Sequence, residues 1–143
     1  MNEFQERLQE LLIEYKMSRL QLAKFLKISS TTLNGYFNKN YYPDIEIAIH
    51  MSKFFNCSID YLLGLTDNKK SIKMNNKSFF ENFDDLIKQS GLSIAQTMKN
   101  LKMSEYNYYR WRDGLFPKTV NLIDISKYFE TSIVHLIGNK IIN

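Results

Sequence analysis

The sequence is poor in the residues that interrupt or cross-link a chain. Its 143 residues include five glycines, two prolines and one cysteine, Cys57. A single cysteine excludes an internal disulfide and a zinc site built from several thiolates, and it suits a reducing compartment. Cys57 stands at the end of an apolar stripe, so we expect it to pack as a small buried hydrophobe.

Long hydrophobic runs are absent as well. No segment approaches the roughly 18 consecutive apolar residues of a membrane span. The opening MNEFQERL is acidic, where a secretory signal would be basic and then apolar. We therefore expect a cytoplasmic protein that has no membrane partner.

The residue patterns of catalytic and metal sites are also missing. The sequence has no glycine-rich phosphate loop and no nucleophile elbow. His50 and His135 lack a cysteine or acidic pair at metal-ligand spacing, so we interpret them as solvated helix residues. Asp84 and Asp85 are interpreted as first-turn helix acids, which the helix dipole favours. The sequence predicts no enzyme, no metal and no cofactor.

The composition is that of a compact globular protein. Hydrophobic residues make up 44% and aromatic residues 14%, which is enough for a packed core. The formal net charge is +4, and the excess lies mainly in Lys69, Lys70, Lys73 and Lys77. A mild basic balance permits nucleic-acid binding but does not demonstrate it.

The most informative feature is an internal repeat. PDIEIAIHMSKFFNCSIDYLLG, from Pro43, recurs as PKTVNLIDISKYFETSIVHLIG, from Pro117, with the apolar positions in register. A period of about 75 residues is too long for a solenoid unit, so it predicts two tandem domains. We place them at residues 1–66 and 78–143, joined by a short polar linker at 67–77.

Each copy predicts five short helices and hence an all-α fold. Apolar residues at three- and four-residue spacing indicate the first helix, and Ser18 with Gln21 forms a capping box at the second. Ser29 and Ser58 are the predicted caps of the third and fifth helices, and Gly64 ends the fifth. The helices predicted in the second copy are Phe79–Ser90, Ser93–Leu101, Ser104–Asp113, Val120–Phe129 and Ser132–Ile137.

These segments resemble a known family of regulators. Through LAKFLKISSTTLNGYFN, YP and MSKFFNCSIDYLLGLTD, the first copy is similar to the lambda repressor and Cro family of helix-turn-helix proteins, often called the XRE family. The second, more divergent copy resembles it through LSIAQTMKNLKMSEYNYYRW, FP and ISKYFETSIVHLIG. The resemblance implies that the second helix crosses the phosphate backbone of double-stranded DNA while the third enters the major groove.

The family's contact positions can be carried onto the first copy. The residues expected to face bases are Ser30, Thr31, Asn34 and Gly35. Asparagine can pair with adenine and the threonine methyl can contact thymine, which predicts a preference for A·T-rich half-sites. The residues expected at phosphates are Arg19, Ser29, Asn38, Lys39 and Tyr42. Leu33 and Tyr36 are expected to face the core.

The same positions in the second copy leave two alternatives open. They hold Glu105, Tyr106, Tyr109 and Arg110, with Arg112 just beyond. Arg110 could read guanine and Glu105 could accept from cytosine. However, Ile94 stands where the first copy has Arg19, and tyrosine with arginine also suits a protein interface. Tyr108 and Trp111 are expected in the core.

The sequence therefore predicts a sequence-specific DNA-binding transcriptional repressor of phage or mobile-element type. The alternative is a protein-interaction regulator, antitoxin-like or an adaptor, whose second copy binds a partner. A homodimer and a regulatory protein or peptide are the further partners considered. An operator occupied by one chain would use both copies on DNA, whereas two chains on a palindrome would indicate dimerisation through the second copy.

Overall fold

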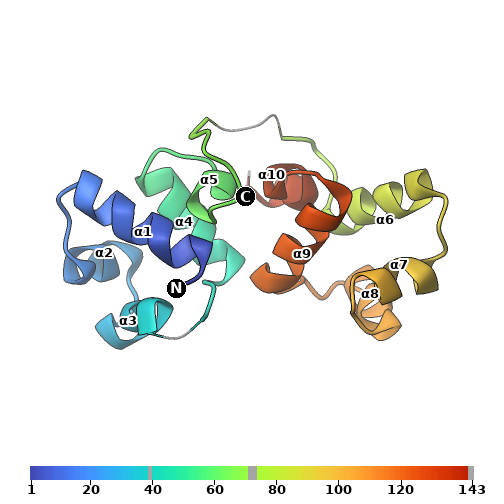
Figure 1. Cartoon of the computed structure of the whole chain (residues 1–143), viewed down its shortest axis with the longest axis horizontal. Helices are drawn as coiled ribbons and strands as arrows, with labels where there is room; N and C mark the ends of the chain where they lie inside the picture. The colour runs from blue at the N-terminus through green and yellow to red at the C-terminus, as the bar shows by residue number, and fades with distance from the viewer. Residues whose placement is uncertain (39, 71–73, 142–143) are drawn as a thin grey trace. The chain divides into compact units, whose positions relative to one another are not determined.

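The structure, a computed structural model, describes residues 1–38, 40–70 and 74–141. All regular secondary structure in these ranges is helical, in agreement with the predicted all-α class. The chain contacts divide it into two compact units, unit 1 at Met1–Ser71 and unit 2 at Ile72–Asn143. Figure 1 labels their helices, and each unit is described by itself below.

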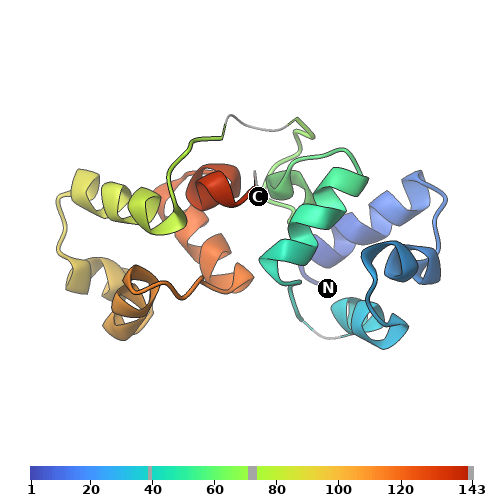
Figure 2. The same cartoon turned by 180° about the vertical axis from the view of Figure 1, so that it is seen from behind.

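Five helices of unit 1 surround one apolar core. They are α1 (Glu3–Glu14), α2 (Arg19–Leu26), α3 (Ser30–Asn38), α4 (Ile45–Phe54) and α5 (Ile59–Leu62). Helices α2 and α3 lie side by side, as Figure 1 and, from behind, Figure 2 both show. The largest fully buried side chains in the described part of this unit are those of Phe4, Leu8, Leu11, Leu22, Leu33, Met51, Phe55, Leu62 and Leu63.

Unit 2 is built from helices at matching places in its sequence. They are α6 (Phe79–Ser90), α7 (Ile94–Asn100), α8 (Glu105–Arg112), α9 (Thr119–Phe129) and α10 (Ile133–Ile137), followed by the 3₁₀ turn η1 (Gly138–Ile141). Every helix predicted for the second copy is present, with ends that differ by one residue or none. Phe83, Met98 and Leu122 are fully buried in its core.

Serine side chains start most of these helices. A serine hydroxyl directly before the helix accepts a hydrogen bond from a backbone N–H of the first turn, which satisfies a donor that has no partner inside the helix. This cap is confirmed at Ser18, Ser58, Ser93, Ser104 and Ser132. At Ser18 the capping box is complete, since Gln21 Oε1 accepts in return from the serine N–H at 2.9 Å.

Backbone conformations in unit 2 repeat those of unit 1. Four residues of unit 1 with positive φ have a counterpart about 75 residues later that is also in the left-handed region. The pairs are Lys16 with Gly91, Lys27 with Lys102, Asn56 with Glu130 and Gly64 with Gly138. Because most side chains disfavour positive φ, this recurrence is a repeat of chain path and not of composition alone.

The ends of the stretch predicted as a linker are bonded to the units. Ser58 N donates to the carbonyl of Lys69 at 2.9 Å in unit 1. In unit 2, Asn139 N donates to the carbonyl of Lys77 at 3.0 Å, and Asn75 Oδ1 accepts from the Asn82 side chain at 3.2 Å. The polar composition of this stretch therefore also serves specific hydrogen bonds. Lys73 lies outside the described residues.

The turn between α2 and α3 contains a residue with a strained backbone, and removing this strain should change the stability of unit 1 measurably. Lys27 has φ 58° and ψ 40°. A non-glycine residue in this region of φ and ψ is strained by about 1–2 kcal/mol. Glycine avoids this strain, but ordering its more flexible backbone on folding costs about 0.5–1 kcal/mol. We expect Lys27→Gly to raise the free energy of unfolding of unit 1 by about 0.5–1 kcal/mol, measured by amide hydrogen exchange. Lys24→Gly, inside α2, should instead lower it by about 1 kcal/mol; a loss in both variants would contradict this reason.

Candidate nucleic-acid interface

Helix α3 is fixed to unit 1 along one side. Leu33 is fully buried, and Tyr36 and Phe37 are 9% exposed, which confirms the inward orientation expected for Leu33 and Tyr36. The buried side-chain amide of Gln5, on α1, donates a hydrogen bond to the carbonyl of Tyr36. Burial, together with the nearby Asp44 carboxylate, raises the pKa of Tyr36 and keeps its phenol neutral. These contacts hold α3 by one face and leave its other face to the surface.

The residues predicted to read bases lie on that other face. Ser30 and Thr31 are exposed, and Asn34 and Gly35 are half-buried. A Cβ added at Gly35 would meet no heavy atom of the described residues within 4 Å, apart from its own helix backbone and chain neighbours. Another molecule can therefore approach α3 closely along this side.

Arg19, predicted at a phosphate, is held in place by α3. Its guanidinium carbon lies 3.9 Å from the centre of the Phe37 ring, and its Nη1 donates to Asn34 Oδ1 at a long 3.4 Å. Such stacking on an aromatic face is a favourable arrangement for arginine. Phe37 was missed by the sequence reasoning, although an aromatic residue beside buried Tyr36 was a visible signal.

The other predicted phosphate residues differ in how accessible they are. Asn38 is exposed, and Lys39 lies outside the described residues. Ser29 is exposed, but its hydroxyl already accepts from Thr32 N at 3.0 Å and lies 2.8 Å from the Thr32 hydroxyl, so it caps α3 as well. Tyr42 is half-buried, with its ring 6.2 Å from that of Phe4.

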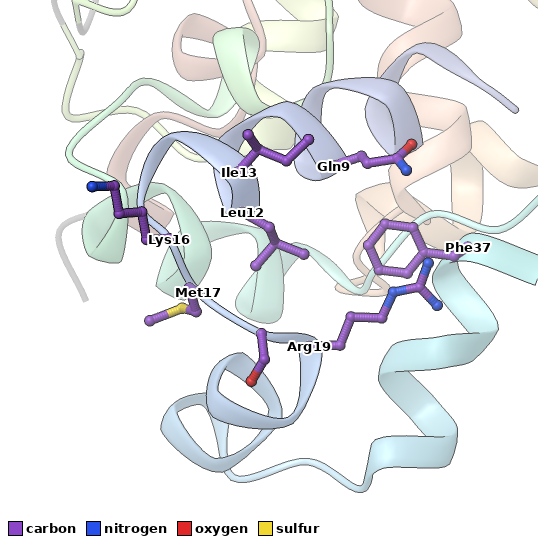
Figure 3. Close-up of a pocket in the computed structure, with 8 residues that line it drawn as sticks. Gln9, Leu12, Ile13, Lys16, Met17, Arg19 and Phe37 are labelled. Carbon is purple, nitrogen blue, oxygen red and sulfur yellow. The ribbon is translucent and has the colours of Figure 1, made fainter.

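An open groove lies next to Arg19. It has a volume of about 440 Å³ and is lined by Gln9, Leu12, Ile13, Lys16, Met17, Ser18, Arg19 and Phe37. Figure 3 shows Arg19 extending along Phe37 at one end of the groove, with Lys16 at the other. Its lining is largely apolar with basic residues at two sides, which is compatible with an anionic chain passing along the rim.

Comparison with known proteins assigns this arrangement of helices to a family. The helix-turn-helix family model matches residues 8–62, which run from the middle of α1 to the end of α5. A relative in Bacillus subtilis (strain 168), named as the uncharacterized HTH-type transcriptional regulator YobD, is 31% identical over 81 residues, 55% of this chain and 72% of that protein. The chain belongs to the helix-turn-helix family. No solved structure gives a significant match.

The helix-turn-helix match lies within unit 1, and unit 2 presents a different surface at the corresponding positions. Glu105, Arg110 and Arg112 are exposed, and Tyr106 is 66% exposed. Tyr109 is half-buried. The guanidinium carbons of Arg110 and Arg112 lie 5.6 Å and 5.1 Å from the ring centres of Tyr106 and Tyr109. This side of α8 therefore alternates rings and positive charges.

Helix α8 is anchored through its inner residues, as expected. Tyr108 and Trp111 are 6% and 4% exposed. The Tyr108 hydroxyl donates to Asp84 Oδ1 at 2.7 Å. Burial and this hydrogen bond raise the pKa of Tyr108 to about 12. Burial alone would raise the pKa of Asp84, but hydrogen bonds from Lys88 and Tyr108 hold it below its usual value.

Two interpretations of polar residues from the sequence were wrong. Asp84 and Asp85 lie in the middle of α6 and not in its first turn, and they bind Lys88 and Lys77 at 2.9 and 2.7 Å. His50 is exposed as expected, but His135 is half-buried, with its Nδ1 3.2 Å from the Asn75 side chain. The lysine partner of Asp84 is one helical turn away, whereas Asn75 lies 60 positions from His135, so no local sequence pattern could show the second contact.

The basic excess around the predicted linker is partly paired. Lys69 Nζ lies 2.8 Å from Glu14 Oε1, and Lys77 Nζ lies 2.7 Å from Asp85 Oδ2. The hydrogen bonds to these carboxylates raise the pKa of both lysines. Both pairs are exposed, so they are weak and open to exchange with other anions.

The described residues contain few groups for other chemistry. Within them, no three His, Cys, Asp or Glu side chains gather as a metal site would require. Cys57 is buried as predicted, and burial raises the pKa of its thiol to about 11, so it is uncharged and unreactive near neutral pH. None of the helices in these ranges combines the length and apolarity that crossing a bilayer requires.

Proposed function

We propose that the protein is a sequence-specific DNA-binding transcriptional regulator that acts in the cytoplasm by occupying an operator. The observation that carries the proposal is the surface of α3 in unit 1, where Thr31 and Asn34 are accessible while Leu33 and Tyr36 are buried. The family match over residues 8–62 supports it. The mode of action that we favour is repression of the phage type, in which the bound protein blocks polymerase at a promoter. This mode needs no catalysis.

In this proposal the N-terminal part of α3 enters the major groove and α2 crosses the backbone. Asn34 would pair with adenine, and the Thr31 methyl would contact a thymine methyl, with Ser30 and Gly35 next to the same bases. Since this face offers no arginine or lysine to guanine, we expect the operator half-site to be rich in A·T pairs.

The phosphate contacts would come from both ends of this helix pair. Arg19 supplies a guanidinium that is already positioned on Phe37, which reduces the side-chain freedom lost on binding. Ser29, Asn38, Lys39 and Tyr42 complete the set that we assign to the backbone. These contacts would fix the register of α3 without carrying sequence information.

Unit 2, with residues 78–143, is proposed to be a second helix-turn-helix domain. The recurrence of helices, serine caps and left-handed residues supports this assignment. A further likeness is the hydrogen bond from Arg7 to the carbonyl of Tyr61, which is matched by that from Asn82 to the carbonyl of His135. Residues 67–77 connect the two domains.

A protein-interaction regulator is the second candidate. Tyr106, at 66% exposure with Arg110 beside it, is the observation that favours it, because tyrosine and arginine are enriched at protein interfaces. The partner would be a second copy of the chain or a regulatory protein. In that case unit 1 would still bind DNA, and unit 2 would determine the oligomer or the response.

The test is selection of bound fragments from random DNA by the full chain, followed by titration of the selected site. We expect Asn34→Ala to weaken binding by about 10- to 100-fold, which corresponds to 1–3 kcal/mol, and to relax the preference at one base pair. Arg19→Ala should weaken binding to all sequences alike and lower the salt slope by about 1. His50→Ala, on the exposed side of α4, is the control and should leave both unchanged.

Absence of binding to any oligonucleotide at low ionic strength would refute the proposal. A selected site to which the wild type and Asn34→Ala bind with the same affinity and the same base preference would refute the assignment of base reading to Asn34.

A further inference from the structure

Helices α7 and α8 can be matched to α2 and α3 residue by residue. Ile94 is the first residue of α7, directly after the capping Ser93, as Arg19 is the first residue of α2 after its own capping serine. In the turns that follow, Lys27 and Lys102 both have φ 58°. The turn geometry therefore fixes the correspondence independently of side-chain similarity.

The same correspondence continues to the ends of the two helices. In unit 1 the buried Tyr36 is followed by Phe37, and in unit 2 the buried Trp111 is followed by Arg112. Phe37 and Arg112 come equally far after the left-handed lysine. They are therefore equivalent positions.

Unit 1 shows that the first position of the second helix and this position near the end of the third helix are neighbours. The Arg19 guanidinium lies 3.9 Å from the Phe37 ring centre, and Figure 3 shows the two side chains together beside the groove. In unit 2 the equivalent residues are Ile94 and Arg112. The basic and the apolar residue have thus exchanged helices, and the arginine of unit 2 is exposed, with its guanidinium carbon 5.1 Å from the centre of the Tyr109 ring.

We propose that unit 2 also binds double-stranded DNA, with Arg112 contacting the phosphate that Arg19 contacts in unit 1 and Arg110 reading a guanine. The inference rests on the proposed function and extends it to a composite operator. One half-site would be A·T-rich and read by unit 1, and the other would contain a G·C pair and be read by unit 2.

The charges around Arg112 are compatible with this role. Its Nε pairs with Asp113 Oδ1 at 3.0 Å, an exposed contact that a phosphate can share through the Nη groups of the same guanidinium. Lys99, Lys102 and Arg110 are exposed on α7, on the following turn and on α8. Glu105 is the opposing charge, and it would have to face a base donor, as glutamate does at cytosine.

The exchanged positions of the basic and the apolar residue also favour DNA over a protein as the partner of unit 2. A surface of exposed tyrosine and arginine alone would serve either class of macromolecule. A protein interface gives no reason for an arginine near the junction of these two helices when the position equivalent to Arg19 holds isoleucine. A phosphate contact does, since the junction is where a docked helix pair meets the backbone.

The experiment uses the full chain, its selected DNA site and a salt titration of the affinity. We expect Arg112→Phe to lower the slope of log affinity against log salt by about 1 and to shorten the footprint on the side of the G·C-containing half-site. Adding Ile94→Arg to Arg112→Phe rebuilds the arrangement of unit 1 and should restore the slope. Lys127→Ala removes one positive charge from α9 in the same unit and should have little effect.

Other outcomes overturn the inference. If Arg112→Phe leaves slope and footprint unchanged while Arg19→Ala lowers the slope, unit 1 alone binds DNA and the proposed function stands without this extension. A selected site without any required G·C pair, or one that is unchanged by Arg110→Ala, overturns the base assignment. A defect that the double variant fails to rescue overturns the phosphate assignment of Arg112, because a guanidinium at the position of Arg19 would then not replace it. If the wild type binds no DNA, the proposed function itself fails.

Discussion

Replacing Gly138 with alanine is expected to destabilise unit 2 by about 3 kcal/mol or more, one of the largest effects of any single methyl group in the chain. Gly138 has φ 52° and ψ −119°, a combination that is strained for every other residue. A Cβ there would lie 2.1 Å from the Lys77 carbonyl oxygen, 2.8 Å from Asn82 Nδ2 and 2.9 Å from Asn75 Oδ1. Backbone strain of about 1–2 kcal/mol therefore adds to the loss of these contacts.

The measurement is urea unfolding followed by the fluorescence of Trp111, the only tryptophan of the chain and a buried residue of unit 2. Gly91→Ala is the matched control, because Gly91 also has positive φ, 75°, but a Cβ there would meet no heavy atom of the described residues within 4 Å beyond its own chain neighbours. It should lose only the strain, about 1–2 kcal/mol. If both variants lost the same free energy of unfolding, the crowding at Gly138 would be relieved by a small shift of its neighbours, and the close contacts there would not contribute to the stability of unit 2.

The contacts around Gly138 explain why the end of the predicted linker is part of unit 2. Asn82, at 2% exposure, donates to Asn75 Oδ1 and to the carbonyls of His135 and Leu136 at 3.2, 2.9 and 3.2 Å. Such a buried amide costs free energy unless it is hydrogen-bonded. The segment before α6 is therefore needed to complete the packing of α10.

Helices and their starts could be predicted because their causes are local. A serine cap such as Ser18 or Ser93 and the apolar spacing after it act within one or two turns, and the structure differs from the prediction by about one residue at the ends. The left-handed turn residues were harder to predict. Lys27, Lys102 and Glu130 are not glycine, so composition gives no signal for their conformation.

Long-range polar contacts were not predictable from one sequence. Asp84 reads as a helix-start acid, but tertiary packing brings it to Tyr108 on another helix. His135 reads as a surface residue, but Asn75 reaches it from 60 positions away. Both cases depend on which helices pack together, and the periodicity of one helix does not contain that information.

The proposed DNA-reading residues came from the repeat and the resemblance, and what these could not supply was geometry. The alignment of the copies already pairs Arg19 with Ile94. It gains meaning only when the structure places Arg19 against Phe37, because an exchange between two positions matters only if they are neighbours. This neighbourhood in unit 1 is the basis for comparing Arg112 of unit 2 with Arg19.

Replacing Arg7 with alanine should lower the free energy of unfolding of unit 1 by about 3 kcal/mol. The side chain is 12% exposed, and Nη1 donates to the carbonyls of Tyr61 and Thr66 at 2.6 and 3.2 Å. Its guanidinium carbon lies 3.8 Å from the Tyr61 ring centre. Hydrogen bonds from a charged donor contribute about 1.5–3 kcal/mol and a cation–π contact about 0.5–1 kcal/mol or more. Amide hydrogen exchange at Leu62, in α5, measures the loss within unit 1.

The ion pairs of Arg7 lead to the opposite expectation and so provide the control. Asp67 and Glu10, 3.3 and 3.5 Å from the guanidinium, have side chains 105% and 71% exposed, and exposed pairs contribute about 0–1 kcal/mol. Asp67→Asn should therefore change the free energy of unfolding little. Arg7→Lys keeps the positive charge but lacks the planar guanidinium, so it should lower the free energy of unfolding by more than half as much as Arg7→Ala does. If Asp67→Asn were as damaging as Arg7→Ala, the attraction between charges would be holding α1 to the end of α5. The geometry indicates instead that the hydrogen bonds to the carbonyls of Tyr61 and Thr66 do so, because the side chain that donates them is 12% exposed whereas both carboxylates lie in solvent.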